Sequence, residues 1–173
     1  MLYSVDRNLR PNCIRYGYGE ESLDNAIRQG LRLGGNLLVD GNMEAANTSA
    51  WTAARSATLS KESGGCCDGK QVLRVAYGGL VNPSATQDVL TLGKVYRISG
   101  WARSDGSGEP YVVVSGGPEE ILWQGGTSGL WKRFDVITSP IATVTLVKLY
   151  NVGGEGTYVE YDNVAAQEVV AGA

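Results

Sequence analysis

The sequence predicts an all-β protein: an antiparallel jelly-roll β-sandwich preceded by an N-terminal extended arm and a short helix. Many short segments alternate apolar and polar residues, and Gly, Pro, Ser and Asp separate them. The chain has 24 glycines among 173 residues, which suits frequent tight turns. Hydrophobic residues make up 43% of the chain, and its length is sufficient for one core of ordinary size.

Residues 1–35 form a leading segment that differs from the rest of the chain. Residues 1–19 combine Tyr and Arg without a sustained period, which indicates an extended arm. Residues 20–34 predict a short amphipathic helix, with Ser22 as N-cap and Gly34 after its end. The helix packs either on its own sandwich or on a neighbouring subunit, and periodicity does not separate the two. The residues expected to dock on a partner are Tyr3, Arg7, Arg10, Tyr16, Leu23, Ile27 and Leu31.

Residues 36–168 form the predicted sandwich, and residues 169–173 form a C-terminal tail. The expected opening and closing strands of the sandwich are residues 36–44 and 158–164, with acidic side chains placed to join the first strand to the last. The clearest alternation is in residues 95–103, where Tyr96 and Ile98 share one face and Trp101 lies on the other. The other expected strands are residues 71–75, 88–92, 111–115, 121–124, 131–138 and 143–150.

Several classes of function are disfavoured by composition. The chain has no histidine, which removes the usual general base, the commonest metal ligand and every Ser-His or Cys-His pair. Three cysteines are too few, and wrongly spaced, for a tetrahedral zinc site. A net charge of −3 with dispersed basic residues argues against nucleic-acid binding. No signal peptide and no membrane span is visible.

Several short motifs follow one another in residues 36 to about 168. They are Asn36-Leu37-Leu38, Asp40-Gly41-Asn42-Met43-Glu44, Trp51, Gly69 to Val75, Gly93 to Trp101, Trp131-Lys132-Arg133-Phe134 and Tyr161-Asp162-Asn163-Val164. In their order and spacing, these motifs resemble the jelly rolls of carbohydrate-binding modules related to galactose-binding domains. The resemblance covers most of the chain, and it implies a β-sandwich without implying one particular function.

The resemblance implies a structural calcium ion between the opening and closing strands. By position, its candidate ligands are Glu44 and Asp162, with Asp40 and backbone carbonyls completing the shell. Calcium prefers six to eight oxygen ligands and can join two distant chain segments. The alternative is that the carboxylates accept backbone hydrogen bonds, in which case the protein requires no cofactor.

The resemblance also implies a sugar-binding surface on which aromatic rings stack against pyranose rings. Trp101 is the candidate platform, with Arg97, Arg103 and Tyr111 beside it, and with Trp123 and Tyr150 as further members. The alternative is that Trp101 packs structurally, as aromatic residues in strands commonly do. In the family, the positions of Trp51 and Trp131 usually belong to the core.

These observations favour a non-enzymatic structural protein of a bacteriophage virion, either a capsid decoration (cement) protein or a tail appendage. Such a protein would assemble in the host cytoplasm and dock through its arm on other virion proteins or on copies of itself, with a host glycan as a candidate further partner. The alternative is a carbohydrate-binding module that recognises a glycan on a sheet face. An enzyme is the least favoured class, because the paired acids Glu119 and Glu120 lie in an expected turn and are interpreted as solvated charge.

Overall fold

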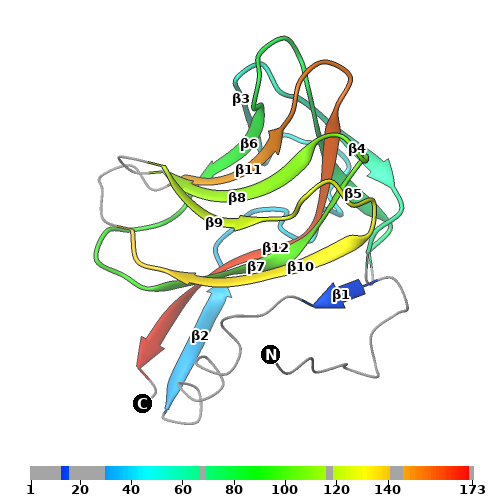
Figure 1. Cartoon of the computed structure of the whole chain (residues 1–173). Helices are drawn as coiled ribbons and strands as arrows, with labels where there is room; N and C mark the ends of the chain where they lie inside the picture. Colours follow the sequence, from blue (N-terminus) through cyan, green and yellow to red (C-terminus); the bar gives the residue numbers. More distant parts are fainter. Residues whose placement is uncertain (1–12, 16–29, 67–68, 116–118, 141–145, 172–173) are drawn as a thin grey trace.

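The computed structural model describes residues 13–15, 30–66, 69–115, 119–140 and 146–171, which form two facing β-sheets (Figure 1). No helix is present in this part of the chain, and hence none that could cross a membrane. The predicted all-β sandwich is therefore confirmed. Its strands are β1 (Cys13–Arg15), β2 (Leu31–Asn36), β3 (Thr52–Ala54), β4 (Thr58–Ser63), β5 (Gln71–Ala76), β6 (Ser84–Asp88), β7 (Tyr96–Ser104), β8 (Glu109–Ser115), β9 (Glu120–Gln124), β10 (Trp131–Thr138), β11 (Leu146–Val152) and β12 (Tyr158–Ala171).

The two sheets differ in size and in strand order. The seven-stranded sheet runs β1-β10-β7-β12-β5-β4, and β2 pairs with the far end of β12. The five-stranded sheet runs β3-β6-β11-β8-β9. All of these pairs are antiparallel except β1 with β10. Neighbours in the sheets are mostly distant in sequence, so the fold depends on long-range pairing.

Strand β7 shows why the alternating pattern produces a two-layer core. Tyr96, Ile98 and Ala102 are at most 1% exposed and lie between the sheets, as the alternation predicts. Gly100 on the same face permits a close approach, because an added Cβ would lie 2.6 Å from the ring of Phe134. The inner face of β7 therefore packs directly against the inner faces of its neighbours.

The predicted helix is wrong in its last part, because residues 31–34 belong to strand β2. Strand β12 extends beyond the end of its neighbour β5, which pairs only with Tyr158–Tyr161. The later backbone groups of β12 need hydrogen-bond partners, and β2 supplies them at Val169–Ala171. The seven-stranded sheet thus extends beyond the domain boundaries expected at residues 36 and 168, because β2 begins at Leu31 and β12 ends at Ala171. Residues 20–29 of the predicted helix lie outside the described residues.

The expected opening strand is also corrected, because residues 37–50 form turns and bends. This opening loop still runs along β12: Leu37 N–H donates to Ala166 O at 2.9 Å, and Val164 N–H donates to Gly41 O at 2.7 Å. A second correction concerns the strand expected at residues 88–92, which instead covers Ser84–Asp88 as β6. The two segments are joined by a contact between distant residues, because the Gln87 side chain of β6 exchanges hydrogen bonds with the backbone of Val39 in the opening loop.

Candidate functional site

Of the residues expected to dock on a partner, only Leu31 lies within the described part of the chain. Leu31 is half-buried in β2 and pairs with Ala171 at the end of β12. Docking through the arm therefore stays a prediction. The other six residues of this group, Tyr3, Arg7, Arg10, Tyr16, Leu23 and Ile27, lie outside the described residues.

Glu44 and Asp162, two of the predicted calcium ligands, accept hydrogen bonds from backbone N–H groups. Glu44 Oε1 accepts from Lys70 at 2.7 Å and from Gln71 at 3.0 Å, and the bond from Gln71 is the main reason why the pKa of Glu44 is lowered. Asp162 Oδ2 accepts from Cys66 at 2.8 Å. Burial, together with the charge of Glu44, raises the pKa of Asp162. The two carboxylates thus join the opening loop and β12 to the turn before β5.

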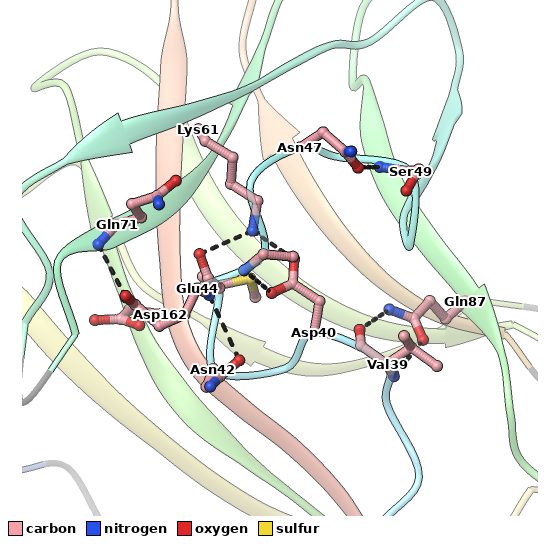
Figure 2. A network of polar contacts seen from close by, with 12 residues as sticks. Val39, Asp40, Asn42, Glu44, Asn47, Ser49, Lys61, Gln71, Gln87 and Asp162 are labelled. Carbon is pink, nitrogen blue, oxygen red and sulfur yellow. Dashed lines mark hydrogen bonds and ion pairs between the residues drawn. The ribbon is translucent and has the colours of Figure 1, made fainter.

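Asp40, the third predicted ligand, is engaged differently. Its Oδ2 atom lies 2.5 Å from the ammonium nitrogen of Lys61 on β4, and its Oδ1 atom accepts from Ala45 N–H at 2.8 Å (Figure 2). Asp40 is therefore one half of a buried ion pair. No local pattern around Lys61 predicts that its side chain enters this region.

The four residues expected to form one sugar-binding surface lie on two different sheets. Trp101, Arg97 and Arg103 belong to β7 of the seven-stranded sheet, whereas Tyr111 belongs to β8 of the five-stranded sheet. The structure therefore does not bring Tyr111 together with the other three. Arg97 is held by Asp135, with Nε donating to Oδ1 at 2.7 Å.

Trp101 lies on the outer face of the seven-stranded sheet but is only 8% exposed. It forms a buried cluster with Cys66, Val72 and Trp131, separate from the core between the sheets. The guanidinium of Arg103 lies 4.7 Å from the ring centroid of Trp131 and covers this cluster further. The Trp101 ring is therefore engaged in packing and offers little surface to a ligand.

Two tyrosines stand side by side on the outer face of the five-stranded sheet. Tyr111 of β8 pairs in register with Tyr150 of β11, so both side chains project from the same face. Their neighbours Val112 and Leu149 are fully buried in the core, which places the tyrosines on the opposite, outer face. Tyr111 is half-buried, whereas Tyr150 is only 6% exposed, so Tyr111 presents the accessible ring. Strands β8 and β9 curve with their concave side toward this face (Figure 1). We call this surface the tyrosine face.

Charged and hydroxyl groups surround the two rings. Lys148, two residues before Tyr150 on β11, donates to Glu119 Oε1 at 2.8 Å, and the Tyr150 hydroxyl donates to the same oxygen at 2.5 Å. The bond from Lys148, followed by that from Tyr150, lowers the pKa of Glu119. Burial, followed by the bond to Glu119, raises the pKa of Tyr150 to about 12. Glu119 is therefore a fixed carboxylate that orients both neighbours.

The tyrosine face is also tied to the opposite sheet. The hydroxyl of Tyr161, which is fully buried on β12, lies 2.9 Å from the carbonyl oxygen of Tyr111 and 2.6 Å from that of Tyr150. Its pKa is raised well above the ordinary value, because burial disfavours the charged form. The backbone that presents the two rings is thus held by a buried polar contact across the core.

One edge of the tyrosine face is built from tightly packed loops. Arg55 and Ser56, which join β3 to β4, both have left-handed backbone angles, at φ 53° and 56°. An added Cβ on Gly78 would lie 2.0 Å from Ser56 O, so the loop before β6 packs directly on this turn. Arg55 Nε donates to Val81 O at 3.0 Å and links the two loops. These contacts join the two loops at this edge of the face.

The pH dependence of stability should show the effect of the carboxylates with lowered pKa. Burial alone would raise the pKa of Asp105, but N–H groups of Gly108, Tyr158 and Ser107 lower it overall. A carboxylate with a lowered folded pKa stabilises the protein above its unfolded pKa, and this stabilisation is lost as pH falls through the folded value. Unfolding by urea should therefore become easier below about pH 4.

Asp105→Asn provides the comparison for this pH series. The variant should be less stable than wild type at pH 7 but should lose less further stability on acidification. Asp162, whose pKa is raised, acts in the opposite direction, because its contribution is lost as pH rises through its folded pKa. Equal acid slopes for wild type and Asp105→Asn would contradict the assignment.

Comparisons with known proteins identify the fold as that of carbohydrate-binding modules. No protein-family profile and no curated protein matches the sequence. The CBM22-1 xylan-binding domain of Xyn10C from Paenibacillus barcinonensis has a TM-score of 0.64 at 18% identity, covering 82% of this chain and 99% of that chain. TmCBM61 in complex with β-1,4-galactotriose has a TM-score of 0.53 at 18% identity, covering 76% and 97%. The chain is thus a carbohydrate-binding-module-like jelly roll.

One similar structure comes from a virus. The enzymatically active domain of tailspike protein 4 from bacteriophage CBA120 has a TM-score of 0.57 at 11% identity, covering 78% of this chain and 21% of that chain. At this identity the likeness shows the fold alone. Apart from this tailspike, the comparisons give the virion interpretation no support, and they favour the alternative interpretation of a glycan-binding module.

Proposed function

We propose that this chain is a non-catalytic module that binds a polysaccharide on its tyrosine face. The observation that supports the proposal most strongly is the half-buried ring of Tyr111 on an outer sheet face, beside Tyr150 and polar groups held in fixed positions. The ring of Tyr111 offers an apolar surface to one side of a sugar ring. Tyr150 is only 6% exposed and its hydroxyl is bonded to Glu119, so it supports the neighbouring ring and is not itself a stacking platform.

The site chemistry suits a neutral glycan better than a charged one. Within the described residues, the exposed carboxylate of Glu119 is balanced by Lys148, and the charge of Arg55 acts on it as well. The face therefore presents hydrogen-bonding groups without a large excess of either sign. Sites of this kind bind through a few placed polar groups and stacked rings. The ligands of the two similar modules, xylan and β-1,4-galactotriose, suggest a neutral β-linked chain as the first class to test.

The test is calorimetric titration of the protein with xylohexaose and with β-1,4-galactotriose, complemented by a glycan array. Wild type should bind at least one neutral oligosaccharide. Tyr111→Ala, which removes a half-buried ring from the tyrosine face, should weaken that binding at least about tenfold, equivalent to roughly 1.4 kcal/mol. Thermal melting of the same samples checks that the variant is folded.

Tyr158→Ala is the matched control. Tyr158 is also half-buried, but it lies on the seven-stranded sheet, where the guanidinium of Arg74 is 4.0 Å from its ring centroid. This variant should bind the glycan as wild type does. Loss of binding in Tyr158→Ala with retention in Tyr111→Ala would move the site to the other sheet. Absence of binding to any neutral glycan would refute the proposed function.

A further inference from the structure

Lys61 places a buried positive charge among the carboxylates that join the opening loop to the sandwich. Its side chain is 6% exposed, and that of its partner Asp40 is 4% exposed. The ammonium group also donates to the carbonyl oxygen of Met43 at 2.9 Å (Figure 2). A lysine is rarely buried to this extent unless its charge is compensated.

The backbone of the opening loop is bent around this ammonium group. Asp40 and Met43, the two residues that contact Lys61, have left-handed backbone angles, at φ 52° and 61°. Such conformations are uncommon for residues other than glycine and persist only where the surroundings enforce them. Met43 is fully buried, so the loop is anchored in the core on its other side. The loop therefore directs the Asp40 carboxylate and the Met43 carbonyl oxygen toward the ammonium group of Lys61.

The charge of Lys61 also acts on the carboxylates of Glu44 and Asp162. It acts to lower the pKa of Glu44 and of Asp162, and the two carboxylates are close enough for Glu44 to raise the pKa of Asp162. Three acidic side chains thus share one buried cation, which comes from the chain itself.

These acidic side chains are the ones that the family resemblance assigns to calcium, and the structure does not fit that ion. Calcium requires six to eight oxygen ligands. Both oxygens of Asp40 are engaged by Lys61 and Ala45, and Asp162 accepts backbone hydrogen bonds at both of its oxygens. In the described part of the chain, no group of three or more His, Cys, Asp or Glu residues could hold a metal ion.

We propose that Lys61 is a built-in cation that replaces a bound metal ion in fastening the opening loop to β4. A divalent ion and an ammonium group cannot occupy neighbouring positions around Asp40 without strong repulsion. The protein therefore completes this junction during folding without taking up calcium. Its stability therefore depends on the Lys61–Asp40 pair.

The test has one arm on wild type and one on variants. The melting temperature of wild type should be the same in excess calcium and in excess chelator, because no metal is bound only by the native state. Lys61→Met preserves the length of the side chain but leaves Asp40 and the Met43 carbonyl without a cation. This variant should melt about 10 °C below wild type.

A double variant separates the role of the charge from that of packing. Asp40→Asn combined with Lys61→Met removes both charges, and it should melt at a higher temperature than Lys61→Met alone. Lys94→Met, which breaks an exposed pair with Glu168, is the control and should melt close to wild type. The inference is overturned if chelator lowers the melting temperature of wild type, or if the double variant is no more stable than Lys61→Met. The wild-type arm decides the matter even if Lys61→Met fails to fold.

Discussion

Replacing Trp101 with alanine should lower the free energy of unfolding by about 3–5 kcal/mol and leave glycan binding by the folded protein unchanged. The loss is large because the ring is 8% exposed and closes a cluster with Val72, Cys66 and Trp131. Binding should persist because Trp101 lies on the seven-stranded sheet, on the side of the sandwich opposite Tyr111.

Urea denaturation followed by circular dichroism measures the first effect, and titration with the glycan that wild type binds measures the second. The titration must be made well below the melting temperature of the variant, so that unfolding does not imitate lost affinity. A Trp101→Ala protein that is as stable as wild type but no longer binds would place the sugar platform on the seven-stranded sheet. That result would contradict both the structural role of Trp101 and the assignment of the tyrosine face.

Replacing Glu160 with alanine should destabilise the protein by about 2–4 kcal/mol. Glu160 is 2% exposed on the outer face of β12, where it accepts from Arg74 at 2.8 Å and from Arg103 at 2.5 Å. The variant would leave two guanidinium groups facing each other without a counter-charge. These groups are 28% and 31% exposed, so water offsets part of the cost.

Glu160→Gln and Glu168→Ala are the controls for this prediction. Glutamine preserves the shape and one acceptor, so Glu160→Gln should be less destabilising than Glu160→Ala. Glu168 forms an exposed pair with Lys94, and its removal should change stability by no more than about 0.5 kcal/mol. If Glu160→Ala unfolds at the wild-type urea midpoint, the two arginine contacts contribute no net stability.

Strand prediction succeeded where the alternation of side chains was strong. The strand predicted at residues 95–103 is present as β7 at residues 96–104, because the alternation over this stretch lets only one face enter the core. Prediction failed at β6, whose residues Ser84, Thr86 and Gln87 are polar but buried. Gln87 exchanges hydrogen bonds with the backbone of Val39, a contact across 48 residues that no local pattern encodes.

The candidate site was only partly accessible to sequence reasoning. Tyr111 and Tyr150 were among the expected aromatic residues, but their pairing depends on the register between β8 and β11. Trp123, another expected member, instead packs on the core side, with its ring centroid 5.4 Å from that of Phe134. Glu119 was interpreted as solvated charge, although it accepts hydrogen bonds from Lys148 and Tyr150. A charge in a turn carries no local signal of such partners.

The sequence by itself determined the all-β class, the jelly-roll resemblance and most strand positions, because short-range alternation and turn residues encode which backbone segments are extended. Only the tertiary structure decided which aromatic rings on the outer sheet faces are covered by other side chains. Trp101 and Tyr111 have similar local patterns, but one ring is closed over by neighbouring strands and the other remains half-exposed. The same holds for Lys61, since a lysine in a polar strand becomes a buried cation only when a loop folded from residues 40–45 surrounds it.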